Sequence, residues 1–101
     1  MAKAYIVAQV DHADPDAIAE YRERAPLSVG RFGGRMLVRG GRQESLEGAE
    51  PRSRVVLIEF PSFDRAKEWY DSEEYTALRA IRMAACDGDL FVVEALEKPV
   101  P

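Results

Sequence analysis

An apolar run over residues 55–60 ends at a proline, and this junction constrains the fold more than any other stretch of the chain. The run, Val-Val-Leu-Ile-Glu-Phe, is rich in β-branched and aromatic residues and therefore predicts a buried strand. Pro61 ends the strand, because proline cannot donate a hydrogen bond to a neighbouring strand. Ser62 or Asp64 can then cap a helix that runs through Trp69. The junction indicates a domain that mixes strands and helices.

The N-terminal part of the chain predicts a strand followed by a helix. Residues 4–10 alternate between two sides that are both fairly apolar, as in a strand that is covered on both faces. Asp14 is a good helix cap and Pro15 fits the first helical position, so a helix begins here. We expect Pro26 to end or kink this helix, because proline lacks the N–H that an α-helix uses. Residues 27–32 would then form a turn or loop.

Two glycine pairs frame a second strand. Glycines occupy positions 33–34 and 40–41, and both pairs indicate turns. The segment between them, residues 35–39, predicts a strand. Residues 42–53 are polar and predict an exposed connection to the strand at 55–60.

The C-terminal third predicts one more helix and one more strand. Residues 71–72 interrupt the helix that contains Trp69, and residues 73–85 predict a second helical segment. The sequence Asp-Gly-Asp at 87–89 is typical of a turn. Residues 90–96 predict the last strand.

The resulting order, β-α-β-β-α-β, is the split pattern of ferredoxin-like α+β folds. A length of 101 residues predicts one domain over the whole chain, with a core from about residue 4 to residue 96. Helices on one side of an antiparallel sheet leave its other face open. That face would carry one of the two apolar sides of the first strand, which is too apolar to stay exposed. We therefore expect a homodimer in which two sheets pack face to face.

Charge and composition limit the partners of the chain. The net charge of −4 argues against nucleic acid, because phosphate binding needs a basic face. Most of the cations are arginine, which fits recognition of an anionic small ligand or reflects a genome of high GC content. Cys86 is the only cysteine, so no intramolecular disulfide can form. No segment has the length of a membrane span or the apolar core of a signal peptide, so we expect a cytoplasmic protein with no membrane partner.

A family resemblance rests on five segments and covers nearly the whole chain. They are residues 5–12 (Tyr-Ile-Val-Ala-Gln-Val-Asp-His), 33–41 (Gly-Gly-Arg-Met-Leu-Val-Arg-Gly-Gly), 54–61 (Arg-Val-Val-Leu-Ile-Glu-Phe-Pro), 69–75 (Trp-Tyr-Asp-Ser-Glu-Glu-Tyr) and 88–94 (Gly-Asp-Leu-Phe-Val-Val-Glu). Jointly they resemble the domain-of-unknown-function family numbered 1330, in the dimeric α/β-barrel superfamily. The resemblance implies a ferredoxin-like protomer, a homodimeric α/β barrel and no established activity. The wider superfamily includes cofactor-independent monooxygenases, isomerases and haem enzymes, and an activity carried over from them would rest on fold analogy alone.

Polar side chains at strand ends and on the last helix form the candidate binding site. Arg39 and Arg54 flank the apolar parts of two strands, so their guanidinium groups could converge at one end of the sheet. With Glu59 and Arg82 nearby, they would bind the carboxylate of a small ligand in a bidentate manner. Tyr75 would border this pocket. The alternative, which we favour from the sequence, is a structural Arg–Glu network that ties strands to a helix or crosses the dimer interface.

Four aromatic side chains fall at helical spacing and allow two interpretations. They are Tyr21, Trp69, Tyr70 and Tyr75. They could line a pocket between the helices and the sheet. Aromatic residues at such spacing more often belong to the core, and we favour that interpretation.

No residue pattern points to a metal, a cofactor or a nucleophile. His12 is the sole histidine, and one histidine with one distant cysteine does not form a metal site. His12 could transfer a proton, but a loop residue before a helix is the favoured interpretation. The glycine pairs lack the lysine and hydroxyl residue of a phosphate loop. We therefore expect no cofactor and no metal, assign no catalytic residue, and retain two hypotheses: a small-molecule binding protein or cofactor-free enzyme, and a non-catalytic interaction module.

Overall fold

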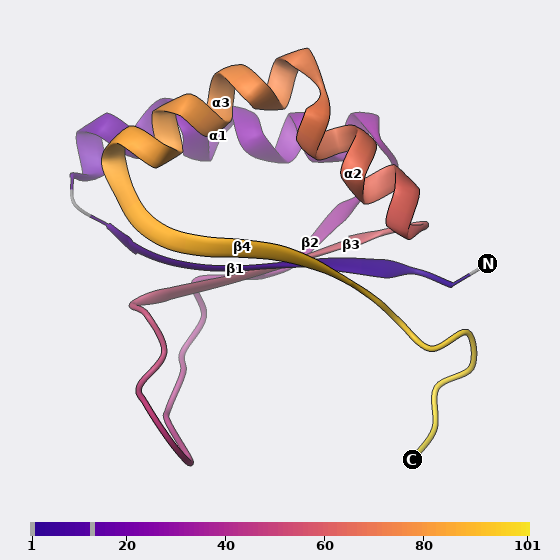
Figure 1. The fold of residues 1–101 in the computed structure, drawn as a ribbon. Coiled ribbons are helices and arrows are strands. Elements are labelled where there is room, and N and C mark those ends of the chain that lie inside the picture. The colour runs from indigo at the N-terminus through magenta and orange to yellow at the C-terminus, as the bar shows by residue number, and fades with distance from the viewer. Residues whose placement is uncertain (1, 13) are drawn as a thin grey trace.

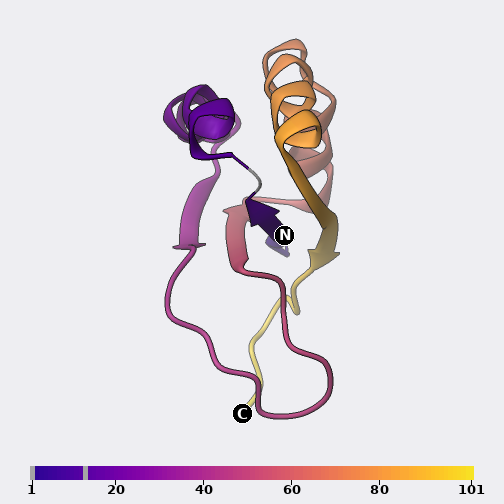
Figure 2. The same cartoon turned by 90° about the vertical axis from the view of Figure 1, so that its left-hand side faces the viewer.

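An antiparallel sheet carries helices on one face only (Figure 1). The structure is a computed structural model that describes residues 2–12 and 14–101, and His12 is described by its backbone alone. The elements of the described chain are β1 (Ala4–His12), α1 (Pro15–Arg31), β2 (Arg35–Arg39), β3 (Arg54–Phe60), α2 (Phe63–Asp71), α3 (Glu73–Ala85) and β4 (Cys86–Glu94). In Figure 2, α1 lies on one side of the helical layer, and α2 with α3 lies on the other. This order confirms the predicted β-α-β-β-α-β pattern, with α2 and α3 together in the place of the second helix.

The sheet has the strand order β2-β3-β1-β4, and neighbouring strands are antiparallel. This is the ferredoxin-like α+β arrangement that the sequence predicts. Ile6 of β1 pairs with Ile58 of β3 and with Val92 of β4. Ile6 is almost fully buried in the hydrophobic core. The even-numbered side of β1 therefore faces the helices.

An aromatic cluster fills the core between the helices and the sheet. The ring centroid of Trp69 lies 3.9 Å from that of Tyr75 and 5.4 Å from that of Phe60, and all three side chains are fully buried. Trp69 Nε1 donates a hydrogen bond to Ser28 Oγ at 3.0 Å, so the polar group of the indole is satisfied. Trp69 and Tyr75 are therefore core residues, in agreement with the favoured interpretation of the aromatic spacing.

Helix α1 continues through Pro26 to Arg31, so the predicted helix end at Pro26 and the predicted loop over residues 27–32 are wrong. The N–H that proline lacks would have bonded to the carbonyl group of Arg22, four residues earlier. Arg39 replaces it, because its Nη2 donates to the Arg22 carbonyl oxygen at 2.6 Å. A contact from the sheet thus supplies the hydrogen bond that the helix cannot make by itself.

Strand β4 begins at Cys86 and ends at Glu94, so the predicted turn at residues 87–89 is wrong. Gly88 pairs with Val10 of β1 inside the ladder. A Cβ atom on Gly88 would lie 2.4 Å from the backbone oxygen of Gln9. This glycine therefore permits the close approach of two strands and does not form a turn.

A β-bulge in β2 sets the direction of the Arg39 side chain. Met36 pairs with Ile58, and the register then shifts so that Val38 pairs with Leu57. Strict alternation would place Met36 and Arg39 on opposite sides of the sheet, whereas the extra residue of the bulge puts both on the side of the helices. Arg39 can therefore reach α1.

The middle of the sheet face away from the helices is apolar, between the polar residues Glu59 and Asp89. Val7 pairs with Leu57 and with Phe91 across neighbouring strands on this face, and Phe91 is 53% exposed. Figure 1 shows that the connection between β2 and β3 and the chain after β4 both extend on this side of the sheet. The uncovered face is thus flanked by two extended segments.

Candidate functional site

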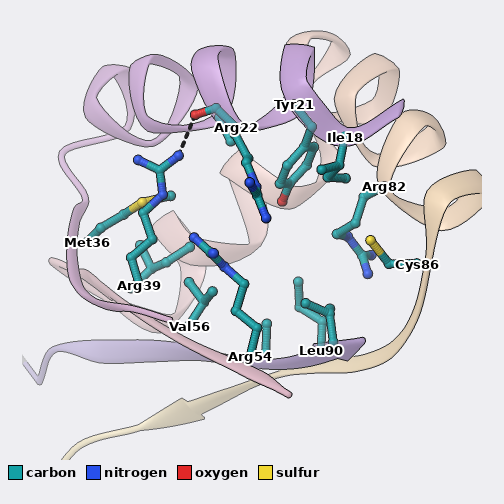
Figure 3. Close-up of a pocket in the computed structure, with 14 residues that line it drawn as sticks. Ile18, Tyr21, Arg22, Met36, Arg39, Arg54, Val56, Arg82, Cys86 and Leu90 are labelled. Carbon is teal, nitrogen blue, oxygen red and sulfur yellow. Dashed lines mark hydrogen bonds between the residues drawn. The ribbon is translucent and has the colours of Figure 1, made fainter. Parts of the chain in front are cut away.

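A cavity of about 50 Å³ lies between α1, α3 and the helix-facing side of the sheet (Figure 3). Its apolar walls are Ala8, Val10, Ile18, Ala25, Met36, Val56, Ile58 and Leu90. Its polar lining is Tyr21, Cys86 and the arginines Arg22, Arg39, Arg54 and Arg82. The cavity has room for a few water molecules or for the buried part of a small ligand.

Three arginines from three elements form an arginine cluster, which we define as Arg22 of α1, Arg39 of β2 and Arg54 of β3. Figure 3 shows Arg22 and Arg54 pointing towards each other, and Arg39 reaching up to α1. Burial, followed by the charges of Arg22 and Arg39, lowers the pKa of Arg54 below its usual value. A Cβ atom on Gly40 would lie 3.0 Å from Arg54 Cζ, so this glycine leaves room for the Arg54 side chain. The cluster concentrates positive charge at one side of the cavity.

Arg82 enters the cavity from α3, on the other side. Arg82 is only 7% exposed, and its guanidinium group points towards the sheet beside Cys86 (Figure 3). Within the described residues, Nε of Arg82 has no hydrogen-bond partner and its guanidinium group forms no ion pair. A buried cation without a partner is unfavourable, so Arg82 is able to gain from binding an anion.

Two tyrosine hydroxyl groups meet at the wall of the cavity. The Tyr21 and Tyr75 oxygens lie 2.8 Å apart in a hydrogen bond, and the two rings meet edge to face with centroids 6.1 Å apart. Burial, followed by the neighbouring Tyr75, raises the pKa of Tyr21, so its hydroxyl group stays neutral. Tyr21 lines the cavity and can offer a hydrogen bond to a ligand.

No aspartate or glutamate lines this cavity in the part of the chain that the structure describes. Its polar groups are guanidinium groups, one tyrosine hydroxyl and the thiol of Cys86, and the first two are hydrogen-bond donors suited to carboxylate oxygens. With apolar walls beside them, they can bind a small organic anion.

The structure brings together three of the five predicted site residues, because Arg39, Arg54 and Arg82 line the same cavity. Tyr75 is fully buried behind the wall and reaches the cavity only through its hydrogen bond to Tyr21.

Glu59 lies on the opposite face of the sheet and does not join them. The Tyr5 hydroxyl donates to Oε2 of Glu59 at 3.1 Å, Arg35 Nε donates to Oε1 at 2.9 Å, and Lys3 Nζ lies 3.6 Å from Oε1. Burial raises the pKa of Glu59, but the bonds from Arg35 and Tyr5 outweigh it and hold the pKa below its usual value. Glu59 thus centres a structural ion-pair network, the arrangement that the alternative interpretation described.

The five predicted site residues did not include Arg22 or Tyr21, although Tyr21 was one of the four aromatic residues that could line a pocket between the helices and the sheet. Arg22 has no assigned role among the sequence predictions. It follows Ile18 by four positions and precedes Ala25 by three, and both of those residues are buried. This spacing places all three residues on one helix face, so the sequence did contain a signal for Arg22.

Metal-binding groups do not gather in the described chain, where no three or more His, Cys, Asp or Glu side chains come close enough to hold a metal ion. The side chain of His12, for which a proton-transfer role was considered, lies outside the described residues. None of the helices in the described chain is both long and apolar enough to cross a membrane.

Several solved structures have a similar fold. A protein of unknown function from Rhodopseudomonas palustris has a TM-score of 0.73 and 24% sequence identity, over 96% of this chain and 85% of that one. SnoaB, a cofactor-independent oxygenase from Streptomyces nogalater, has a TM-score of 0.62 and 12% identity over 97% of each chain. A dimeric ferredoxin-like protein of unknown function from Thermobifida fusca has a TM-score of 0.56 and 12% identity, over 93% and 92%.

At these identities the likeness is one of fold alone. No curated protein matches the sequence. The profile of the family described as domain of unknown function (DUF1330) matches residues 3–96, and the chain therefore belongs to the DUF1330 family.

Proposed function

We propose that the protein binds a small organic acid, with its acid group at the arginines and its apolar part against the cavity walls. The observation that carries this proposal is that Arg54 and Arg82 line the cavity without an ion-pair partner among the described residues. A carboxylate would supply the missing countercharge and accept charge-assisted hydrogen bonds from either group.

A purely structural role has less support for Arg54 and Arg82 than for Arg39, whose Nη2 donates to the Arg22 carbonyl oxygen at 2.6 Å. Arginines with such a role pair with carboxylates, as Arg35 does with Glu59 at 2.9 Å and Arg52 does with Asp11 at 2.9 Å. Arg54 faces other arginines instead, and their charges lower its pKa after the larger effect of burial. The non-catalytic interaction module therefore stays the second-ranked interpretation of these residues.

Titration calorimetry with hexanoate and benzoate tests the proposal. We expect at least one of these acids to bind the wild-type protein and to bind the variant Arg54→Gln about tenfold more weakly, as for the loss of a charge-assisted hydrogen bond. Arg24→Gln is the matched control, because Arg24 lies on the exposed side of α1 and pairs with Glu20 at 2.9 Å. The absence of binding by both acids, or equal weakening by Arg54→Gln and Arg24→Gln, would contradict the proposal.

A reaction of the bound acid without a cofactor is the second candidate function. The Tyr21 hydroxyl lines the cavity and is hydrogen-bonded to the Tyr75 hydroxyl at 2.8 Å, so with Tyr75 as the donor Tyr21 can donate to the ligand. SnoaB has a similar fold and is a cofactor-independent oxygenase, which makes this an analogy of fold. The test is turnover of the bound acid in air: loss of turnover in Tyr21→Phe with unchanged binding supports it, and equal turnover in both proteins counts against it.

We also infer that the protein forms a homodimer through the open face of the sheet. The apolar side chains of Val7, Leu57 and Phe91 on that face support this inference. Proteins of similar fold from Thermobifida fusca and Bacteroides fragilis are described as dimeric.

A further inference from the structure

We propose that the acid bound in this cavity is a dianion, a short-chain dicarboxylate whose two carboxylates bind at opposite sides of the cavity. The inference rests on the proposed function, that the cavity binds an organic acid, and adds the class of acid. The deciding feature is that the cations are divided between two walls rather than gathered at one point.

The two cationic sides belong to different parts of the fold. Arg54 rises from β3, whereas Arg82 descends from α3 just before β4 (Figure 3). Strands β3 and β4 flank β1, so their backbones are about 10 Å apart.

The space between the two sides is apolar. Leu90 of β4 lies between Arg54 and Arg82 in Figure 3, with Ile18 of α1 above it, and both line the cavity. A methylene chain fits such a wall, because burial of its carbon atoms is favourable and no polar group is left without a partner. A compact ion such as inorganic phosphate can reach one side but cannot fill this middle section.

A ligand with a single acid group satisfies only one side. If its carboxylate binds the arginine cluster, Arg82 keeps a buried guanidinium group without a partner in the described chain. If it binds Arg82, Arg54 remains among like charges. A dicarboxylate neutralises both sides at once, and its chain crosses the apolar section between them.

Calorimetry with chain-matched pairs of acids tests the class of ligand on the wild-type protein. The pairs are glutarate against pentanoate and adipate against hexanoate, with inorganic phosphate as a compact anion. We expect at least one dicarboxylate to bind about tenfold or more tightly than its monocarboxylate, as for one additional charge-assisted contact. Phosphate should bind more weakly than that dicarboxylate.

The variant Arg82→Gln assigns the second carboxylate to its partner. We expect the preference for the dicarboxylate over its chain-matched monocarboxylate to disappear in this variant. Arg79→Gln is the matched control, since Arg79 lies on the same helix, packs over the Tyr70 ring at 4.3 Å and does not line the cavity. Circular dichroism verifies that each variant is folded, and if Arg82→Gln is not, the wild-type series alone decides.

The outcomes separate this inference from the function on which it rests. Equal affinity for both members of each pair overturns the dicarboxylate but leaves the binding of organic acids intact. Absence of binding by all these acids overturns both. Tightest binding by phosphate identifies a single compact anion site and overturns the bridging ligand.

Discussion

Arg39 Nη2 donates a hydrogen bond to the backbone oxygen of Arg22 at 2.6 Å, and Arg22 lies four residues before Pro26 in α1. In an α-helix that oxygen would accept from the N–H of residue 26, which proline does not have. The same side chain therefore lines the cavity and completes the hydrogen bonding of the helix above it. This contact couples the site to the stability of α1.

The first prediction concerns this coupling. We expect Arg39→Met to lower the free energy of unfolding by about 1 kcal/mol, the usual net value of one hydrogen bond. In a Pro26→Ala background the cost should be smaller, because alanine at this position restores the N–H that can bond to the Arg22 carbonyl. Urea denaturation of the two single variants and the double variant measures the coupling energy. Arg42→Met, at an exposed position beyond β2, is the control, and additive effects of the Arg39 and Pro26 substitutions would show that the two residues are not coupled.

The second prediction concerns the glycine inside β4. A Cβ atom on Gly88 would lie 2.4 Å from the Gln9 backbone oxygen and 2.6 Å from Val10 Cγ1, so β1 and β4 would have to separate. We expect Gly88→Ala to destabilise the protein by about 2 kcal/mol or more, as for other overpacked positions. Gly41→Ala is the control, because nothing lies within 4 Å of a Cβ atom there. Thermal unfolding of the two variants should differ clearly, and similar melting temperatures would contradict the close approach of the strands.

The elements that depend on local signals could be predicted from the sequence. The strand that ends at Pro61 carries its own β-branched residues, and the cap of α1 is local, since Asp14 Oδ1 accepts from the Asp16 N–H at 3.0 Å. The errors at Pro26 and Gly88 have a different origin. Each depends on a neighbour that is distant in sequence: Arg39 for the helix, and Gln9 for the strand. Sequence rules for turns and for helix-breaking residues consider only adjacent residues, so they predicted a loop after Pro26 and a turn at Gly88.

The candidate site, like the fold, could be predicted from the sequence where it depends on regular periodicity and not where it depends on pairing between distant segments. Arg54 and Arg82 follow from regular strand and helix periodicity. Arg39 reaches the cavity only because of the bulge between Met36 and Val38, and no local sequence pattern predicts this bulge. Glu59 was grouped with the arginines because it lies on the same apolar strand as Arg54. Side chains alternate between the two faces along a strand, so Glu59, five residues after Arg54, lies on the other face of the sheet.

The third prediction concerns alkaline pH. Burial, followed by Tyr75, raises the pKa of Tyr21 above its usual value of 10.0. A group whose pKa is higher in the folded chain than in the unfolded chain stabilises the fold fully at pH values below its pKa in the unfolded chain. This stabilisation is lost as the pH rises from that value towards the pKa in the folded chain. We expect the free energy of unfolding to fall from about pH 10 upwards, with a contribution from Tyr21 of up to about 1.4 kcal/mol per pH unit.

The matched variant for this prediction is Tyr21→Phe. It removes the titrating hydroxyl, so the stability difference between the wild type and the variant should shrink as the pH rises from 9 to 11, a window about one unit either side of the usual tyrosine pKa. Urea unfolding at a series of pH values measures this difference. Parallel stability curves for the two proteins would mean that Tyr21 ionises as readily in the folded chain as in the unfolded one.

The fourth prediction concerns the open face of the sheet. Phe91 is 53% exposed and pairs with Val7, which in turn pairs with Leu57, so a continuous apolar strip crosses β4, β1 and β3. A strip of this kind is typical of a surface that packs against a partner. We expect the wild-type protein to have twice the chain mass in light scattering. Phe91→Glu should shift it towards the monomer, because a carboxylate would be buried without a partner in the interface.

Met83→Glu is the control for this prediction, since Met83 is 64% exposed on α3, in the helical layer and away from the open face. It introduces the same charge at another exposed apolar position and should leave the mass unchanged. A monomeric wild-type protein would remove the dimer, and a dimer that Phe91→Glu does not disturb would place the interface on another surface. The helix-facing cavity lies on the opposite side of the sheet from Phe91, so binding of an organic acid should survive dissociation.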